Sequence, residues 1–186
     1  ADGTYFVEAE GKTFAGEWQD EPTISRTWTV NRSLPASVVI NEVLAVNNTA
    51  FEHEGTFPDV IELYNSGTED YDLGGHWISD NPDNPSKAAF AAGTMVPAEG
   101  YLLVYADESN TSGIHLGFTL DRSGEQLTLY RDGVVLDSVS FGIQADDLSI
   151  GRDDTGNWHL NRPTPGERNS VQFTGNQSRL RISEWF

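Results

Sequence analysis

Glycine and proline punctuate this chain so regularly that it has little room for helices. Its 186 residues include 18 Gly and 8 Pro, and few intervals between them would hold a helix of ordinary length. The intervening segments are short and rich in Val, Ile, Leu, Tyr and Thr, which is typical of strands separated by turns. The spacing therefore predicts an all-β protein.

The clearest single element is a hairpin around Asp132 and Gly133. An Asp-Gly pair between two β-prone runs favours a type I′ turn, because both central residues of that turn need a positive φ. In the second strand of this hairpin, alternation places Val135, Asp137 and Val139 on one face. The strand therefore has either a bulge at Asp137 or a partner for its carboxylate, and the sequence leaves both open.

Five further segments have the composition of strands and are bounded by turn residues. They are residues 37–44, 60–65, 77–79, 100–106 and 148–151. Several short strands separated by turns indicate an antiparallel sandwich or barrel, and not alternating strands and helices.

The ends of the chain differ from its middle. Residues 1–34 contain two strand-like runs and a linker, which predicts a β-hairpin with the features of the end of a preceding domain. Residues 35–170 form the main domain. Residues 171–186 add a last strand, whose sequence resembles that of residues 38–43 and suggests the start of a following domain.

The acidic balance of the chain excludes several classes of partner. Its 11 Lys and Arg stand against 29 Asp and Glu, which gives a formal net charge of -18. Such a surface repels nucleic acid and disfavours an anionic membrane. The longest apolar run, residues 101–106, is far shorter than the roughly 18 residues of a membrane helix. We therefore expect no nucleic-acid partner and no membrane insertion.

No local motif of an enzyme is present. The chain has no Cys, no Gly-x-Ser-x-Gly elbow and no glycine-rich phosphate loop. The histidines, His53, His76, His115 and His159, are separated by 23, 39 and 44 positions, which is not the spacing of a metal site. A Ser-His-Asp group can still assemble in space, because triads ignore sequence order. We predict a protein without catalytic activity, since an enzyme would need a deep pocket at His115 or His159 with two converging carboxylates.

Two acidic loops are candidates for a calcium site. One lies just before residue 60 and the other follows residues 77–79. Calcium prefers roughly six to eight oxygen ligands, which such loops supply. The candidate ligands are Glu54, Asp59, Asp80 and Asp83. Turn capping explains these residues equally well, since Asp accepts local backbone hydrogen bonds. A structural Ca²⁺ is therefore an expectation, with residues 153–157 as a weaker third place.

Aromatic side chains suggest a different kind of site. Trp18 lies at an apparent turn and Trp158 follows a Gly-Asn turn, so both are candidates for flat surfaces on which sugar rings stack. Trp77 lies within a strand, and we expect it in the core. Two exposed, coplanar aromatic rings would favour a carbohydrate-binding module.

The order of several motifs in the middle of the chain is more informative than any one of them. They are residues 39–43 (VINEV), 59–65 (DVIELYN), 72–80 (DLGGHWISD), 96–101 (VPAEGY), 124–130 (GEQLTLY) and 163–166 (PTPG). In this order they resemble the lamin tail domain family, specifically its bacterial members, over residues 37–170. The resemblance implies an immunoglobulin-like antiparallel β-sandwich, here with an N-terminal β-hairpin extension. It supplies no catalytic residues.

The resemblance also suggests a function. Lamin tail domains occur in nuclear lamins and, in bacteria, in secreted or surface-anchored proteins that often contain extracellular enzymes. We expect a non-catalytic interaction or tethering module of a larger exported or cell-surface protein, which binds a partner protein or surface component. The alternative is a carbohydrate-binding module that targets an attached enzyme to a polysaccharide. The oligomeric state stays open, and any export signal is expected to lie outside this sequence.

Overall fold

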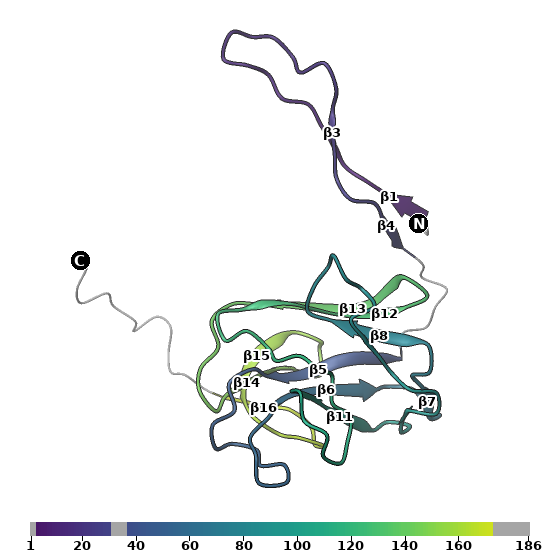
Figure 1. The fold of residues 1–186 in the computed structure, drawn as a ribbon, viewed down its shortest axis with the longest axis vertical. Helices are drawn as coiled ribbons and strands as arrows, with labels where there is room; N and C mark the ends of the chain where they lie inside the picture. Colours follow the sequence, from purple (N-terminus) through teal and green to yellow (C-terminus); the bar gives the residue numbers. More distant parts are fainter. Residues whose placement is uncertain (1–2, 31–36, 173–186) are drawn as a thin grey trace, which may run out of the picture. The chain divides into compact units, whose positions relative to one another are not determined.

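The chain folds into strands, turns and irregular segments (Figure 1). The structure is a computed structural model that describes residues 3–30 and 37–172, and these contain sixteen strands and no helix. No described helix is thus long and apolar enough to cross a bilayer. The all-β prediction is confirmed. The predicted linker and the predicted last strand and following domain fall largely on residues 31–36 and 173–186, outside the described residues, so the predicted domain boundaries stay a prediction.

Backbone contacts divide the chain into two compact units. The first contains the described residues up to Ile40 together with Tyr64–Gly100 and Glu125–Phe141. The second contains Asn41–Leu63, Tyr101–Gly124 and the described residues from Gly142 onward.

An antiparallel ribbon begins the first unit. Strand β1 (Gly3–Tyr5) pairs with β4 (Trp28–Val30), and β2 (Glu8–Ala9) pairs with β3 (Thr23–Ile24) (Figure 1). The predicted N-terminal hairpin therefore forms within the described residues. Two strands alone bury little apolar surface. The exposed apolar side chains of the ribbon are Phe6, Val7, Phe14, Trp18 and Ile24.

The first unit also contains a four-stranded antiparallel sheet. Its order is β13 (Val134–Phe141), β12 (Glu125–Arg131), β8 (His76–Ser79) and β9 (Ala88–Ala89). The buried side chains Ile78, Leu127, Leu129 and Val139 make its apolar face. Two short strands, β7 (Tyr71–Asp72) and β10 (Met95–Val96), form a separate two-stranded antiparallel sheet. In the sequence, β7 precedes β8 and β10 follows β9.

The hairpin between β12 and β13 has the predicted turn and an irregularity in its second strand. Asp132 and Gly133 have φ values of 50° and 76°, as a type I′ turn requires. Leu129 lies opposite Asp137 but the next residue lies opposite Val135, so one residue of β13 is extra. This bulge turns Val135 to the other face, where it is 48% exposed. The prediction that Val135 shares a face with Val139 is therefore wrong.

Asp137 also has the partner that the sequence left open. Its Oδ2 atom accepts a hydrogen bond from the backbone N–H of Ile40 at 2.8 Å. The bulge and the carboxylate partner are thus both present.

The burial of strand β8 differs from the expectation for Trp77. His76 and Ile78 are buried, while Trp77 is only partly buried. His76 is accommodated because its Nε2 lies 3.0 Å from the hydroxyl of Tyr71 and its Nδ1 lies 3.3 Å from the carbonyl of Gly74. Burial lowers the pKa of His76, which favours the neutral ring. The prediction that Trp77 lies in the core is therefore wrong.

The second unit carries most of a six-stranded sheet. Its order is β11 (Tyr101–Ala106), β6 (Asp59–Asn65), β5 (Val38–Leu44), β14 (Ser149–Arg152), β15 (Trp158–Arg162) and β16 (Ser170–Val171). Strands β15 and β16 were not predicted from the sequence. Apolar residues of this sheet that are completely buried include Val43, Ile61, Leu63 and Val104. Burial in β5 is almost continuous, because Asn41 and Glu42 are buried as well.

Candidate functional site

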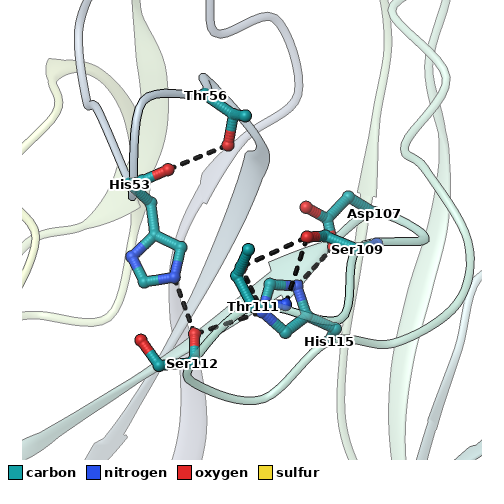
Figure 2. Close-up of polar contacts among 7 residues, drawn as sticks. All are labelled: His53, Thr56, Asp107, Ser109, Thr111, Ser112 and His115. Carbon is teal, nitrogen blue, oxygen red and sulfur yellow. Dashed lines mark hydrogen bonds and ion pairs between the residues drawn. The ribbon is translucent and has the colours of Figure 1, made fainter.

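Two loops of the second unit bring five polar side chains together. The loop between β5 and β6 carries His53 and Glu54, and the segment after β11 carries Asp107, Ser112 and His115. Figure 2 shows the two histidines on either side of Ser112. We call these five residues the Ser112 cluster.

Side chains from outside the cluster hold the first loop in shape. The amide of Asn47 donates to the carbonyls of Phe51 and Pro58 at 2.6 and 2.7 Å and accepts from the N–H of Phe51. Asp147 accepts from the backbone N–H groups of three consecutive residues, Asn48, Thr49 and Ala50. The hydrogen bond from the Thr49 hydroxyl to Oδ2 of Asp147, together with these backbone hydrogen bonds, lowers the pKa of Asp147. The loop is therefore fixed at both of its ends.

A tight turn presents His53 and Glu54 from this loop. The backbones of His53 and Thr56 exchange two hydrogen bonds, and the hydroxyl of Thr56 donates to the carbonyl of His53 (Figure 2). Glu54 and Gly55 between them have φ values of 48° and 83°. Two positive φ values in a two-residue turn match type I′, for which glycine is well suited at the second place.

Ser112 is the point on which the cluster converges. Its carbonyl oxygen lies 2.7 Å from Nε2 of His53 and 3.2 Å from Nε2 of His115. Its hydroxyl donates a short hydrogen bond to the carboxylate of Glu54. This hydrogen bond is the main reason why the pKa of Glu54 is lowered. One residue of the second loop is thus held by three side chains.

His115 has an oxygen acceptor at each of its ring nitrogens. Nδ1 lies 2.5 Å from Oδ1 of Asp107, and Nε2 faces the carbonyl of Ser112. Only the protonated ring carries a donor at both nitrogens. Burial by itself lowers the pKa of His115, but the hydrogen bonds to Asp107 and Ser112 and the nearby carboxylate charges outweigh burial, and the pKa is raised.

Aromatic rings form the base of the cluster. The ring of His53 is stacked on Tyr105 with 4.0 Å between centroids, and His115 lies 5.2 Å from the same ring. Tyr105 is buried with Leu44 and Val60. Gly113 passes so close to Tyr105 that a Cβ atom there would lie 2.6 Å from Cε2 of the ring. The φ of Gly113 is also 111°, so both sterics and backbone conformation favour glycine.

A further carboxylate lies in the same acidic surroundings. Burial raises the pKa of Asp59 to about 6, and the charge of Asp107 raises it as well. The hydrogen bond from the N–H of Leu120, 3.1 Å from Oδ2 of Asp59, opposes this shift. Asp59 is therefore less acidic than an ordinary aspartate.

The chemistry available to His115 follows from its contacts. Thr111, His115 and Asp107 present a hydroxyl, an imidazole and a carboxylate in the order of a hydrolase triad, with Thr111 Oγ1 3.2 Å from Nε2. A general base needs a free lone pair on that nitrogen. The same Nε2 faces the carbonyl of Ser112, which favours a proton there. These contacts therefore indicate that His115 forms an ion pair that fixes the loop, and they do not favour a role as a general base.

A second buried polar group lies in the same unit and includes Glu42 and Glu62. Oε1 of Glu42 lies 2.5 Å from the hydroxyl of Ser149, and its carboxylate also accepts from the N–H of Thr164. Glu62 accepts from the amide of Asn41 at 2.7 Å and, through Oε2, from the N–H of residue 166 at 2.6 Å. Both glutamates thus fix the segment that follows β15.

Burial governs the titration of both glutamates. It raises the pKa of Glu42 and raises that of Glu62 to about 7, where the charge of Glu42 adds to the shift. Asn41 and the N–H of Gly166 nevertheless both donate to Glu62, and donors favour the ionised form. Burial outweighs these donors.

The four predicted calcium ligands lie as two pairs, one pair in each unit. Glu54 is bound by Ser112 and Asp59 by the N–H of Leu120 in the second unit. In the first unit, both oxygens of Asp80 lie 2.7 Å from Nζ of Lys87, and Asp83 pairs with an arginine, Arg26. Across residues 3–30 and 37–172, no three His, Cys, Asp or Glu side chains form a group that could hold a metal ion. The Ca²⁺ expectation stays a hypothesis.

The two predicted sugar-stacking rings each have a cation over one face. Nζ of Lys12 lies 5.0 Å from the centre of the Trp18 ring, and Cζ of Arg152 lies 4.6 Å from that of Trp158. Trp18 is 60% exposed and Trp158 is partly buried. Trp18 belongs to the first unit and Trp158 to the second, and the sugar-stacking role of both stays a prediction.

The Ser112 cluster was missed because its members are far apart in the sequence. His53 and His115 are separated by 62 positions (115 minus 53), and neither lies in a local motif. The Glu-Gly pair before Thr56 is a local turn signal that could have placed His53 at a hairpin. Gly113 two residues before His115 could have indicated a close backbone approach.

Comparison with known proteins identifies one family. The family model described as Lamin Tail Domain matches residues 31–142, which is more than half of the chain. The matched range ends just after β13, so the motif at residues 163–166 lies beyond it. Neither a curated protein nor a solved structure matches. With the antiparallel sheets described above, the match makes the fold an immunoglobulin-like β-sandwich.

Proposed function

The chain belongs to the lamin tail domain family, whose immunoglobulin-like domains often serve in protein interaction, and on that premise we propose that it is a non-catalytic interaction module. It belongs to a larger exported or cell-surface protein and holds a partner protein or surface component in place. It binds without changing its partner chemically.

The family match is the observation that carries this proposal. The contacts of the Ser112 cluster support it, because the imidazole that resembles a catalytic base already lies between Asp107 and the carbonyl of Ser112. The net charge of -18 supports it in a second way. Such a charge keeps an exported module soluble and speeds its encounter with a basic surface.

Retention of surface components by the immobilised domain tests this proposal. The domain is coupled to beads and incubated with an extract of the cell envelope of the organism that makes it. We expect saturable retention of a small set of components, which free domain competes away. The matched control is an unrelated folded protein of equal negative charge. Equal retention on both kinds of bead would contradict a specific interaction.

Polysaccharide binding is tested separately, because it is the alternative function. The domain is mixed with insoluble polysaccharides in Ca²⁺ and again in chelator. We expect it to stay in solution in both, since a cation already lies over one face of Trp18 and of Trp158. Selective depletion by one polymer would favour the carbohydrate-binding module, and its loss in chelator would make Ca²⁺ part of that site.

A further inference from the structure

The ends of the two large sheets differ in how they are protected from additional strands. Exposed end strands pair readily with other chains, and proteins limit this with short strands, charges, bulges or proline. Strands β9 and β16 are each only two residues long. Strand β13 has a bulge and the carboxylate of Asp137.

Strand β11 has none of the protection that sequence can supply. It lies at one end of the six-stranded sheet. Its six residues, Tyr-Leu-Leu-Val-Tyr-Ala, include no charge and no proline. They are also the longest apolar run in the chain. A strand of this kind at a sheet end is a template for strand addition.

The chain already uses part of this edge. The N–H of Tyr105 donates to the carbonyl of Ile114 at 2.7 Å, and the N–H of Leu116 donates to the carbonyl of Tyr105 at 2.9 Å. The resulting bridge between Tyr105 and His115 is parallel. The outer edge of β11 therefore accepts an extended segment, and the Ser112 cluster holds the segment that is there now.

The next position along the edge is Leu103. Backbone groups of alternate residues in a strand point to the same side, so Leu103 directs its N–H and carbonyl outward as Tyr105 does. The backbone N–H and carbonyl of Val104, which lies between them, point towards β6. Among the described residues, no strand or bridge pairs with Leu103 on the outer side.

The surroundings of the edge define the charge of a matching partner. The two segments of the second unit that carry β6 and β11, residues 41–63 and 101–124, contain eight acidic residues and one basic residue, Arg122. The acidic residues that are not buried are Glu52, Glu54, Asp59, Asp107, Glu108 and Asp121. Opposite charges across an interface speed association and fix the choice of partner. A second copy of this chain would bring the same negative charges to the edge.

We propose that the outer edge of β11 adds one extended segment of a partner protein, and that this segment carries Lys or Arg. This proposal rests on the proposed interaction function. It specifies the binding surface of the module and the kind of partner that binds there. Backbone hydrogen bonds at Leu103 supply the pairing, and the basic side chains supply the preference over neutral or acidic segments.

Amide exchange measured by NMR tests the edge directly. The probe is a short capped peptide in which Val and Lys alternate. We expect it to slow exchange of the Leu103 amide at least about tenfold and to leave that of Val104 unchanged. Its binding weakens as salt concentration rises. The matched peptide with Glu in place of Lys does not bind, and neither does the Val-Lys peptide with every amide N-methylated.

Two results would overturn the inference. One is binding of the N-methylated peptide as tight as that of its parent, because backbone donors would then be irrelevant. The other is concentration-dependent dimerisation that protects Leu103 while the Val-Lys peptide does not, because the occupant would then be a second copy.

A variant removes the outward donor from the protein itself. Leu103→Pro deletes the N–H of an edge position, where proline is tolerated in strands. We expect it to lose peptide binding, while Ile143→Pro at an exposed position outside the strands retains it. If Leu103→Pro fails to fold, the peptide comparison still decides. If wild type and folded Leu103→Pro retain envelope proteins equally, the proposal for the β11 edge is wrong. The proposed interaction function is then still supported.

Discussion

Nδ1 of His115 lies 2.5 Å from Oδ1 of Asp107, while the opposite nitrogen of the same ring faces the carbonyl of Ser112. This pairing holds the segment that runs along the outer edge of β11. The side chain of His115 is only 9% exposed, so the pair is largely removed from solvent. A charge-assisted hydrogen bond in such a place is stronger than one at the surface.

The stability of this pair depends on pH. The pKa of His115 is raised above its usual 6.5. A group with a raised pKa in the folded state stabilises the fold fully below the unfolded value, and this stabilisation is lost as pH rises through the folded value. We expect NMR titration of the ring to give a pKa above about 6.5, and Asp107→Asn to lower it. A wild-type value at or below that of a free histidine would contradict the ion pair.

Glu62 gives a second pH dependence. Its pKa is raised from 4.5 to about 7, so the folded state holds a proton that the unfolded state releases. The free energy of unfolding therefore falls as pH rises from about 4.5 to above about 7, by about 3 kcal/mol from this group. Urea unfolding at a series of pH values across this range measures the change in the free energy of unfolding.

Glu62→Gln is the variant that isolates this effect. It cannot ionise, so we expect a smaller fall in stability with pH, with the remaining slope coming from Glu42. It also provides one acceptor for two donors, the amide of Asn41 and the N–H of Gly166. Protonated Glu62 has the same limit, so we expect the variant to be about as stable as wild type at low pH. An unchanged pH slope would contradict the burial of an ionisable Glu62.

Much of the β architecture is local in origin, and for that reason it could be predicted. The Asp132-Gly133 turn follows from the φ values that only a few residue types adopt easily. The local pattern left a bulge in β13 and a partner for Asp137 both open, and the face predicted for Val135 is wrong because the extra residue reverses the alternation there. Trp77 was misplaced for a related reason, since the buried face of β8 accepts His76 once Tyr71 and Gly74 satisfy its nitrogens.

The candidate site could not be predicted from single motifs. His53 and His115 meet because two loops are held by hydrogen bonds from distant residues, including Asp147. Asp80 and Asp83 were correctly recognised as acidic loop residues, but nothing local indicates that Lys87 binds Asp80 through both oxygens. The number of acidic residues, 29, makes chance clusters common and single clusters uninformative.

Gly113 and Gly117 provide a matched pair of substitutions in the segment along β11. Both have positive φ, 111° and 72°, but a Cβ at Gly113 would lie 2.6 Å from Tyr105 while one at Gly117 would meet nothing within 4 Å. We expect Gly117→Ala to cost about 1 kcal/mol through backbone conformation. Gly113→Ala should cost more, about 2–4 kcal/mol, because the ring of Tyr105 must shift.

Chemical denaturation of the two alanine variants measures this difference. Circular dichroism at low denaturant serves as the control for retention of the β fold. Equal losses of stability in the two variants would contradict the close approach of Gly113 to Tyr105.

Thermal unfolding in Ca²⁺ and in chelator tests the acidic loops. Lys87 occupies both oxygens of Asp80, and a cation there has to displace it. We therefore expect the same melting temperature in millimolar Ca²⁺ and in chelator. A melting temperature that rises with Ca²⁺ in wild type and not in Asp80→Asn would support the calcium hypothesis instead.

The central claim is that this module binds a partner without changing it chemically, and the proposed edge of β11 makes that partner a protein. The most direct measurement is binding of the domain to a cell-envelope extract divided in two, with one half treated with protease and the other with periodate, which oxidises sugars. Our account predicts that protease abolishes saturable binding and that periodate leaves it unchanged. Binding that survives protease and is lost after periodate would contradict the account and assign the module to a polysaccharide.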